Sequence, residues 1–317
     1  SLSTFLKLLR ILKKEKPDLI HTHGKGPGLY GRLLGWMLGI PVVHTFHGFQ
    51  YKLLPTIQRW FYLFVENVLT LLTRYHIFVG NGEKNKAKIL MFLNDSNSSV
   101  VNNGIDLDAI QALPLAEEVI ASLDLGSRES IKIFGTLSRV SPEKGLDTLL
   151  EGFSEAIKTA PYIRLLIIGD CPDEHEKYIN TVKQYIHTNG LNKVVKILGP
   201  REDALEILKS IDFYISSSRS EGLPYNLLEA LAVGKPLIAT DIPGNNDIVR
   251  KSVEGVLVPV NLARTLAHGI LTLLELGPEE RKAMQQNGEA RILDQFSLSL
   301  MTQKTFSLYK KVLEGSS

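Results

Sequence analysis

The regular alternation of short, continuously apolar runs with longer helical patterns constrains the fold of this chain more than any other feature. Apolar runs of strand length cover residues 18–22, 41–45, 75–79 and 99–101, and then 131–137, 163–169, 194–198, 213–216, 236–240 and 255–259. Runs that are apolar on both faces and separated by helices are typical of parallel strands covered by helices on both sides. The two series therefore predict an α/β protein with two Rossmann-like domains.

The domain boundaries follow from the gap between the two series. We expect residues 1–110 to form an N-terminal domain, residues 111–295 a C-terminal domain, and residues 296–317 a helix that packs back toward the N-terminal domain. The first series has four strands and opens on a helix, whereas a doubly wound domain usually opens on a strand and a phosphate-facing turn. We therefore expect an incomplete first domain, and a chain that is a fragment or a short form.

Composition excludes several classes of protein. Apolar residues make up 44% of the chain and charged residues 22%, as in soluble globular proteins and unlike disordered ones. A single cysteine, Cys171, excludes a disulfide scaffold. No run of about 18 residues is both apolar and uncharged, so we expect no membrane span. The net charge of +2 provides no global basic field, so we expect no nucleic-acid partner.

Charge is distributed unevenly along the chain. Residues 1–112 carry 13 Lys and Arg against 7 Asp and Glu, whereas the remainder carries 23 against 27. A basic first part suits contact with an anionic membrane surface or a phosphate-bearing ligand, and it equally fits an uneven surface charge without a role. The first 18 residues predict an amphipathic helix without the features of a secretory signal. We expect a cytoplasmic protein with peripheral contact at the inner face of the plasma membrane.

The most apolar helical pattern covers residues 58–73. Charged residues such as Arg59 and Glu66 interrupt it, so the pattern does not predict a membrane span. Two interpretations remain. The helix lies in a membrane interface, with the aromatic side chains of Trp60, Phe61, Tyr62 and Phe64 at headgroup depth, or it is a core helix of the first domain. The sequence favours the core helix.

A glycine-rich run, Gly26 to Gly31, fits the dinucleotide-binding pattern G-x-G-x-x-G after a strand. That interpretation requires an acidic residue about 20 positions further on, to bind the ribose hydroxyls. No Asp or Glu occurs between Asp18 and Glu66, so a nicotinamide site is disfavoured. We expect the glycines to allow a tight turn and close packing.

Two clusters have residue types that bind metals. One contains the histidines at the ends of two predicted strands, His21, His23, His44 and His47, and the other is Asp106-Leu107-Asp108. No carboxylate or cysteine joins the histidines, and the Asp pair fits a turn with Asp108 as a helix cap. We therefore expect no metal. His23 is the best of the histidines for substrate contact, as a hydrogen-bond donor or a stabiliser of the transition state.

The second domain contains a candidate phosphate site. Arg139 and Lys144 bracket a loop that leads into a helix, and two cations beside free backbone N–H groups can bind a diphosphate. The alternative is a pair of solvated surface charges.

A second group of candidates follows the fourth strand of that domain. Glu221 ends a loop, and Pro224 fits the first helical position of a helix that carries Glu229. The N–H groups that open this helix belong to Tyr225, Asn226 and Leu227. A helix N-terminus suits phosphate, and a nearby carboxylate suits a ribose diol. One site can thus hold sugar, diphosphate and ribose in a row.

The run from Glu221 to Glu229 resembles the E-x7-E motif of the family 4 retaining glycosyltransferases, which have the GT-B fold. Arg139 and Lys144 match the R-x4-K pattern of that family in the same order. The runs Asp18–Gly24 and Asn103–Asp106 are similar to further motifs of the family. The run His44–Phe49 resembles members that build bacterial capsule, exopolysaccharide or O-antigen lipopolysaccharide.

The resemblance implies a role for each matching residue. Two domains with parallel sheets would face each other across a cleft. Glu229 would bind the ribose, Arg139 and Lys144 would neutralise the diphosphate, and Glu221 would contact the transferred sugar. His23 would lie near sugar and acceptor as a second catalytic residue. The remaining donor-binding positions are Gly222, Tyr225, Asn226 and Leu227.

The expected activity is hexosyl transfer with retention, from a UDP- or GDP-sugar to a lipid-linked or polysaccharide acceptor, without a cofactor or a metal. The first strand and glycine-rich loop of the family are missing, which leaves an inactive nucleotide-binding module open as an alternative. A GT-B nucleotide-sugar epimerase is a further alternative.

Overall fold

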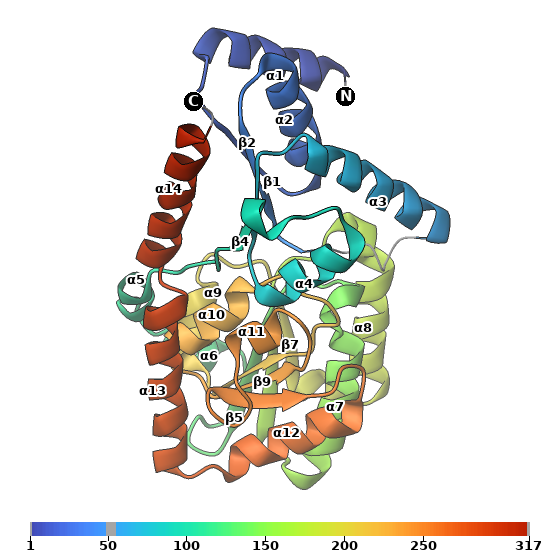
Figure 1. The fold of residues 1–317 in the computed structure, drawn as a ribbon. Helices are drawn as coiled ribbons and strands as arrows, with labels where there is room; N and C mark the ends of the chain where they lie inside the picture. Colours follow the sequence, from blue (N-terminus) through green and yellow to red (C-terminus); the bar gives the residue numbers. More distant parts are fainter. Residues whose placement is uncertain (1, 49–54, 316–317) are drawn as a thin grey trace. The chain divides into compact units, whose positions relative to one another are not determined.

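The computed structural model describes residues 2–48 and 55–315, so Phe49 of the histidine-containing run lies outside the described residues. The chain forms two compact units: Ser1–Asn103 with Leu298–Ser317, and Gly104–Ser297 (Figure 1). The expected boundary at residue 110 therefore moves to Asn103. The residues that follow form two short helices, α5 (Leu107–Gln111) and α6 (Glu117–Ser122), which belong to the second unit.

The first unit is built on a parallel sheet. Within its described residues (2–48, 55–103 and 298–315) the sheet has four strands in the order β1-β2-β3-β4. These are β1 (Ile20–His23), β2 (Val42–Phe46), β3 (Tyr75–Phe78) and β4 (Ser98–Val100), with helices α1 (Leu2–Glu15), α2 (Lys25–Leu38), α3 (Thr56–Leu71), α4 (Asn81–Leu90) and α14 (Leu298–Glu314). A short 3-10 turn, Asp95–Asn97, precedes β4.

The last helix of the chain completes the core of the first unit. Val312 on α14 is buried in one cluster with Val43, Tyr75 and Ile77 of the sheet. The hydroxyl of Tyr309, also on α14, lies 2.5 Å from Nδ1 of a β1 histidine. The end of the chain thus packs on strands that lie more than 200 residues earlier in sequence.

The second unit is a doubly wound domain. All of its residues, 104–297, are described, and six parallel strands follow the order β10-β9-β8-β5-β6-β7. The strands are β5 (Lys132–Leu137), β6 (Ile163–Ile168), β7 (Val195–Gly199), β8 (Phe213–Ser216), β9 (Leu237–Thr240) and β10 (Gly255–Val258). The strand order reverses between β5 and β8, and ligands of open α/β sheets bind at the carboxyl ends of the strands at such a point.

Helices cover both faces of this sheet. They are α5 (Leu107–Gln111), α6 (Glu117–Ser122), α7 (Leu146–Thr159), α8 (Glu176–Thr188), α9 (Ala204–Ser210), α10 (Tyr225–Ala232), α11 (Asn245–Ile248), α12 (Ala263–Glu275) and α13 (Pro278–Gln295), with 3-10 turns at Pro142–Lys144, Asp173–His175 and Leu191–Lys193. All four side chains of β8 are buried, and the rings of Phe134 and Phe213 stack with centroids 4.7 Å apart. The continuous apolar runs therefore form the central strands.

Local details differ from expectation at two places. Helix α2 begins at Lys25, so the glycine-rich run forms its first turns. A Cβ on Gly31 would lie only 2.2 Å from Cγ2 of Thr22 on β1, so the absence of a side chain at Gly31 allows the helix to pack closely on the strand. Helix α5 is capped by Asp106, whose carboxylate accepts the N–H of Ala109 at 3.0 Å. Asp108 lies inside the first turn, so its assignment as the cap was wrong.

The core-helix interpretation of α3 is correct for only one of its faces. Leu63, Glu66 and Leu69 are buried, but Trp60 and Phe61 are 70% and 68% exposed. None of the helices within the described residues is both long and apolar enough to cross a membrane.

Candidate functional site

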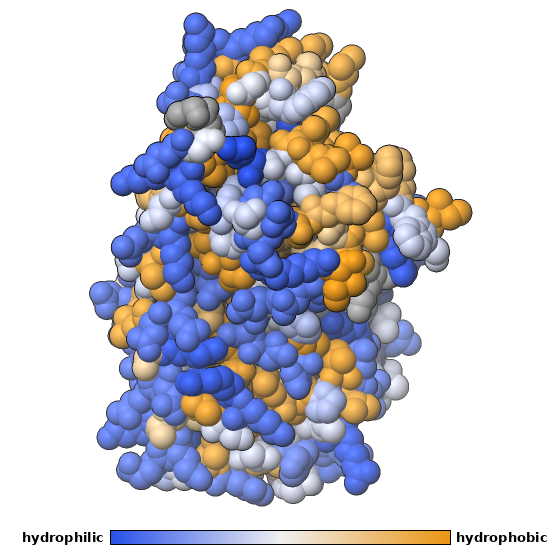
Figure 2. Space-filling model, viewed as in Figure 1, coloured by the Kyte–Doolittle hydropathy of each residue, from blue (hydrophilic) through white to orange (hydrophobic). Residues whose placement is uncertain are grey.

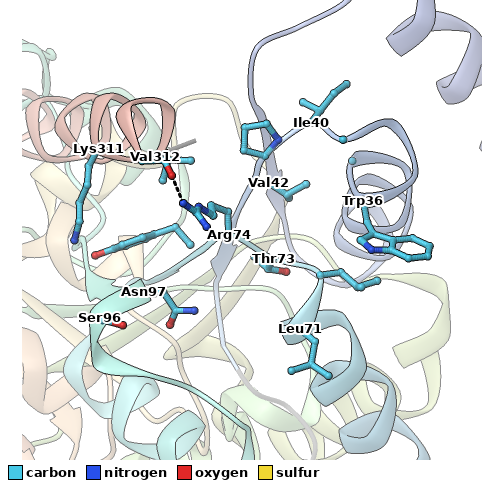
Figure 3. Close-up of a pocket in the computed structure, with 16 residues that line it drawn as sticks. Trp36, Ile40, Val42, Leu71, Thr73, Arg74, Ser96, Asn97, Lys311 and Val312 are labelled. Carbon is cyan, nitrogen blue, oxygen red and sulfur yellow. Dashed lines mark hydrogen bonds between the residues drawn. The ribbon is translucent and has the colours of Figure 1, made fainter. Parts of the chain in front are cut away.

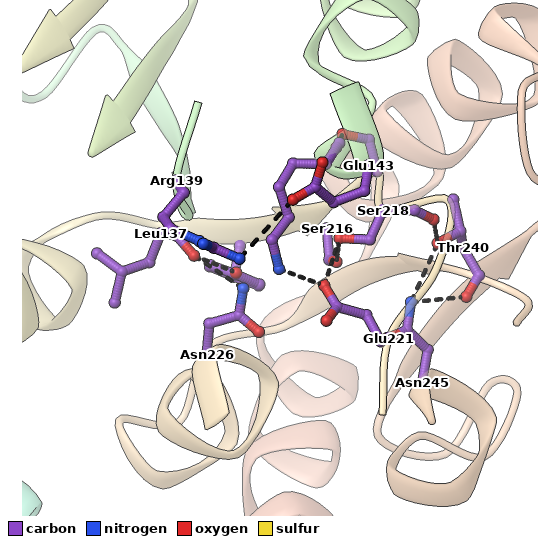
Figure 4. A network of polar contacts seen from close by, with 12 residues as sticks. Leu137, Arg139, Glu143, Ser216, Ser218, Glu221, Asn226, Thr240 and Asn245 are labelled. Carbon is purple, nitrogen blue, oxygen red and sulfur yellow. Dashed lines mark hydrogen bonds and ion pairs between the residues drawn. The ribbon is translucent and has the colours of Figure 1, made fainter. Parts of the chain in front are cut away.

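The candidate site lies at the carboxyl ends of β5 and β8 in the second unit. The loop after β5 runs from Ser138 through a 3-10 turn to Gly145, the N-cap of α7. The loop after β8 runs from Ser217 to Pro224, the N-cap of α10. The polar side chains of both loops meet in one network (Figure 4).

An ion pair joins the two loops. The ammonium Nζ of Lys144 lies 2.6 Å from Oε1 of Glu221, and both side chains are largely buried. The hydroxyl of Ser218 donates to the same oxygen at 2.6 Å. The carboxylate of Glu221 is therefore held in one position by two donors.

Arg219 holds the two loops together, and the sequence analysis missed it. Its guanidinium donates to the carbonyl oxygen of Pro142 and to a carboxylate oxygen of Asp147, each at 2.6 Å. Its backbone N–H donates to the carbonyl oxygen of Glu143 at 2.7 Å. The sequence feature that could have indicated its role is its position, two residues before Glu221 in the same loop.

Gly145 allows the loops to approach this closely. It adopts φ +63°, and a Cβ there would lie 2.4 Å from the carbonyl oxygen of Ser217. The hydroxyl of Ser217 in turn donates to the carbonyl oxygen of Lys144 at 2.8 Å. A residue without a side chain is therefore required where the helix begins.

Arg139 remains available for a ligand. Its side chain is 56% exposed, and its guanidinium lies 3.7 Å from the carboxylate of Glu143. A pair at this distance and exposure is weak. Of the two cations expected to bind a diphosphate, Arg139 is therefore exposed to solvent, whereas Lys144 is largely buried.

Helix α10 opens at the same edge of the sheet. Pro224 occupies the N-cap, one position earlier than expected, and the helix begins at Tyr225. The first N–H groups of a helix have no partner inside it, so those of Tyr225, Asn226 and Leu227 are suited to an anion. The amide nitrogen of Asn226 donates to the carbonyl oxygen of Leu137 at 2.8 Å, which ties α10 to the end of β5.

Glu229 lies on α10 in an environment unlike that of Glu221. Burial raises the pKa of its carboxyl group above the usual value. Among the described residues its carboxylate has no hydrogen-bond or ion-pair partner. A half-buried, unpaired carboxylate is costly, and a ligand hydroxyl that donates to it would offset that cost.

A third loop, after β9, supports the position of Ser218. The hydroxyl of Thr240 donates to the carbonyl oxygen of Ser218 at 2.5 Å, and the amide of Asn245 donates to the carbonyl oxygen of Thr240 at 2.9 Å. The carbonyl oxygen of Gly222 also lies close to this loop: a Cβ on Gly244 would be only 2.5 Å from that oxygen. The loop that carries Glu221 is thus fixed from both sides.

His23 belongs to the first unit, at the end of β1. Its side chain is exposed, and its Nδ1 lies 2.9 Å from Nε2 of His47. His44 is buried beside Thr22, and burial lowers its pKa to about 2. Burial also lowers the pKa of His21 to about 4. Within this cluster, His44 is therefore a buried structural residue and His21 is half-buried, whereas His23 is exposed and accessible to a ligand.

The described residues contain no group of three or more His, Cys, Asp or Glu side chains arranged to hold a metal ion.

Comparison with known proteins identifies both units. Residues 122–291 match the family "Glycosyl transferases group 1", and residues 1–109 match "Glycosyltransferase Family 4". The chain is 28% identical to the Escherichia coli UDP-Gal:alpha-D-GlcNAc-diphosphoundecaprenol alpha-1,3-galactosyltransferase, over 97% of this chain and 79% of that protein.

Solved structures share the fold. The structure of HepE from Anabaena in complex with UDP superposes with a TM-score of 0.84 at 21% identity, over 96% of this chain and 82% of that one. A glycosyltransferase from Rickettsia africae gives a TM-score of 0.83 at 26% identity, over 98% and 81%.

Proposed function

We propose a specific reaction for this chain, which belongs to the group 1, family 4 glycosyltransferases and has the GT-B fold. As a member of that family it is a transferase of glycan synthesis. The proposed reaction moves a hexosyl group from a UDP- or GDP-sugar to a lipid-linked or polysaccharide acceptor, with retention of configuration.

One observation carries the proposal: the Lys144–Glu221 pair lies at the same sheet edge as the N-terminus of α10, and that helix carries Glu229, whose carboxylate has no partner among the residues that the structure describes. The site offers cations and N–H groups for a diphosphate, and a carboxylate for ribose hydroxyls. UDP bound to HepE, and the UDP-sugar named for the Escherichia coli relative, support a nucleotide-sugar donor. The diphosphoundecaprenol in the relative's name supports a lipid-linked acceptor.

The proposed chemistry follows from the charges. The bond between the anomeric carbon and the diphosphate oxygen breaks, the acceptor oxygen bonds to the same face, and the acceptor's proton passes to a donor phosphate oxygen. Negative charge develops on the leaving diphosphate, where Arg139, Lys144 and the α10 N-terminus stabilise it. Glu221, fixed by Lys144 and Ser218, contacts the transferred sugar.

Two further parts of the proposal come from the resemblance. His23 acts in transfer rather than in nucleotide binding, and the fixed cations make a metal unnecessary. We place the protein in the cytoplasm. Transfer that is unchanged in a chelator, and lost in His23→Ala with nucleotide affinity intact, would support both parts.

Calorimetric titration with UDP, GDP and ADP tests the donor site. One nucleotide should bind, and Arg139→Ala should weaken it about 10- to 100-fold, because a charge-assisted hydrogen bond contributes about 1.5–3 kcal/mol. Arg128→Ala is the matched control, since Arg128 is also half-exposed but pairs with Asp212, which precedes β8. Equal loss in both variants would contradict the assignment.

The same preparation separates the alternatives. Transfer to an acceptor, with the product anomer identified by NMR, would support the retaining transferase. Nucleotide binding without transfer would point to an inactive binding module. Conversion of the donor sugar to its epimer without an acceptor would point to an epimerase.

A further inference from the structure

Helix α3 presents a continuous apolar stripe to solvent. Its members are Ile57, Trp60, Phe61, Phe64, Val68 and Leu71, whose exposed fractions run from 42% for Val68 to 84% for Ile57. They recur every three or four residues, so they share one face of the helix. The opposite face is the one that packs on the first unit, through residues such as Leu63 and Leu69. Within the described residues, both faces of α3 are thus apolar but only one is covered.

The stripe continues onto the neighbouring helix. Trp36 and Met37 at the end of α2 are 64% and 56% exposed. Trp36 and Leu71 line the same pocket of about 780 Å³ beside β2 and β3 (Figure 3). Figure 2 shows hydrophobic residues gathered over α3. We call these eight residues of α2 and α3 the apolar face; a patch of this kind on a folded unit marks an interaction surface.

Basic side chains accompany the apolar face. Helix α1 packs on α2 and exposes four basic side chains, Lys7, Arg10, Lys13 and Lys14, against one acidic side chain, Glu15, which lies 3.6 Å from Lys14. The ammonium of Lys25 lies 4.8 Å from the ring centre of Tyr62, which is on the packed side of α3. The one acidic residue of α3, Glu66, is buried and pairs with Arg32 at 2.9 Å. Exposed positive charges therefore outnumber negative ones on α1 and α3, and this excess favours an anionic partner.

We propose that the apolar face inserts into the interfacial region of an anionic lipid bilayer. Exposed Trp and Phe beside Lys and Arg are the composition of helices that lie in a membrane interface, and the cations add attraction to anionic lipids. A second copy of the chain fits less well, because the same basic helix would be present on both partners and like charges disfavour association. This inference concerns the membrane contact of the first unit and does not depend on the proposed reaction.

Intrinsic fluorescence tests the proposal directly. The chain has two tryptophans, Trp36 and Trp60, and both belong to the apolar face. Vesicles of phosphatidylcholine with phosphatidylglycerol should shift their emission to the blue, and brominated lipid should quench it. Vesicles of phosphatidylcholine alone should have a smaller effect. Trp36→Phe leaves Trp60 as the single reporter on α3.

Vesicle flotation with matched variants locates the surface. The triple variant Trp60→Ser, Phe61→Ser, Phe64→Ser should reduce partitioning at least about 100-fold, because each large apolar side chain accounts for about tenfold or more. The control variant Ile89→Ser, Phe92→Ser, Phe306→Ser removes three exposed apolar side chains of the same unit outside the apolar face. It should partition as the unchanged chain does.

Three results would overturn the proposal. The first is an unchanged chain that does not float with anionic vesicles. The second is an equal loss in the two triple variants while both keep the far-ultraviolet circular dichroism of the unchanged chain. The third is a dimer in light scattering that the α3 variant alone dissociates, without any vesicle binding. Because none of these readouts uses sugar transfer, failure here leaves the proposed reaction untouched.

Discussion

Two glutamates that are eight positions apart have opposite electrostatic surroundings. Glu221 is neutralised by Lys144 at 2.6 Å, whereas Glu229 has no partner within the described chain and burial raises its pKa. A carboxylate that already accepts two hydrogen bonds is positioned for a sugar hydroxyl. An unpaired carboxylate gains more from a ligand that donates to it. The environments therefore support different roles for the two residues.

Glutamine at each position separates those roles. Glu229→Gln should weaken nucleotide binding about tenfold by calorimetry, because the remaining amide oxygen accepts without charge assistance. Glu221→Gln should keep nucleotide affinity and lose transfer. Equal loss of nucleotide affinity in both variants would contradict the separate roles.

The pH dependence of binding follows from the raised pKa of Glu229. Ribose hydroxyls donate to the ionised carboxylate, so affinity should be full above the raised pKa and fall as pH decreases through it toward 4.5, the ordinary value. The Glu229→Gln variant should lack this dependence. A pH profile identical in the variant would assign the titration to another group.

At the scale of elements, the site depends on how tightly the loops after β5 and β8 approach. Arg219 bonds both loops, and Gly145 brings the start of α7 against Ser217. The strands in this unit lie within one residue of the sequence prediction, since continuous apolar runs determine them locally. The loop contacts connect residues more than 70 positions apart, and no local pattern encodes them.

Gly145→Ala should disturb the site more than a comparable change elsewhere. The new Cβ would lie 2.4 Å from backbone oxygen, so the loops must separate and nucleotide affinity should fall. Gly190→Ala is the matched control, because Gly190 has φ +67° but open space around it. The control should cost about 1–2 kcal/mol of stability by chemical denaturation and leave affinity unchanged. Equal effects on affinity would refute the steric argument.

At the scale of the molecule, the first unit concentrates histidines that are buried without charge. Burial lowers the pKa of His21 and His76 to about 4 and that of His44 to about 2. In the unfolded chain these groups take up protons below 6.5, the ordinary value, before the folded unit does. Protons therefore bind preferentially to the unfolded state as pH falls from 6.5 toward 4.

The first unit should consequently lose stability in mild acid. His44 and His76, which are fully buried, each lower the unfolding free energy of this unit by about 1.4 kcal/mol per pH unit below the ordinary pKa, until the folded group titrates. The half-buried His21 lowers it by less, because solvent screens its charge. Hydrogen exchange with mass detection, corrected for intrinsic rates, should show protection of β1, β2 and β3 falling before that of β5, β6 and β8. Uniform loss across both units would contradict this account.

The sequence alone determined the parallel α/β units and the strand positions, because these depend on local apolar patterns. Its short motifs predicted the candidate site residues, with the exception of Arg219. The sequence also allowed both interpretations of α3, since an apolar pattern does not reveal which face is covered. Only the tertiary structure decided that Trp60 and Phe61 are exposed, that Lys144 pairs with Glu221, and that Arg219 joins the loops. The physical reason is the same for each: burial and pairing depend on contacts between segments distant in sequence.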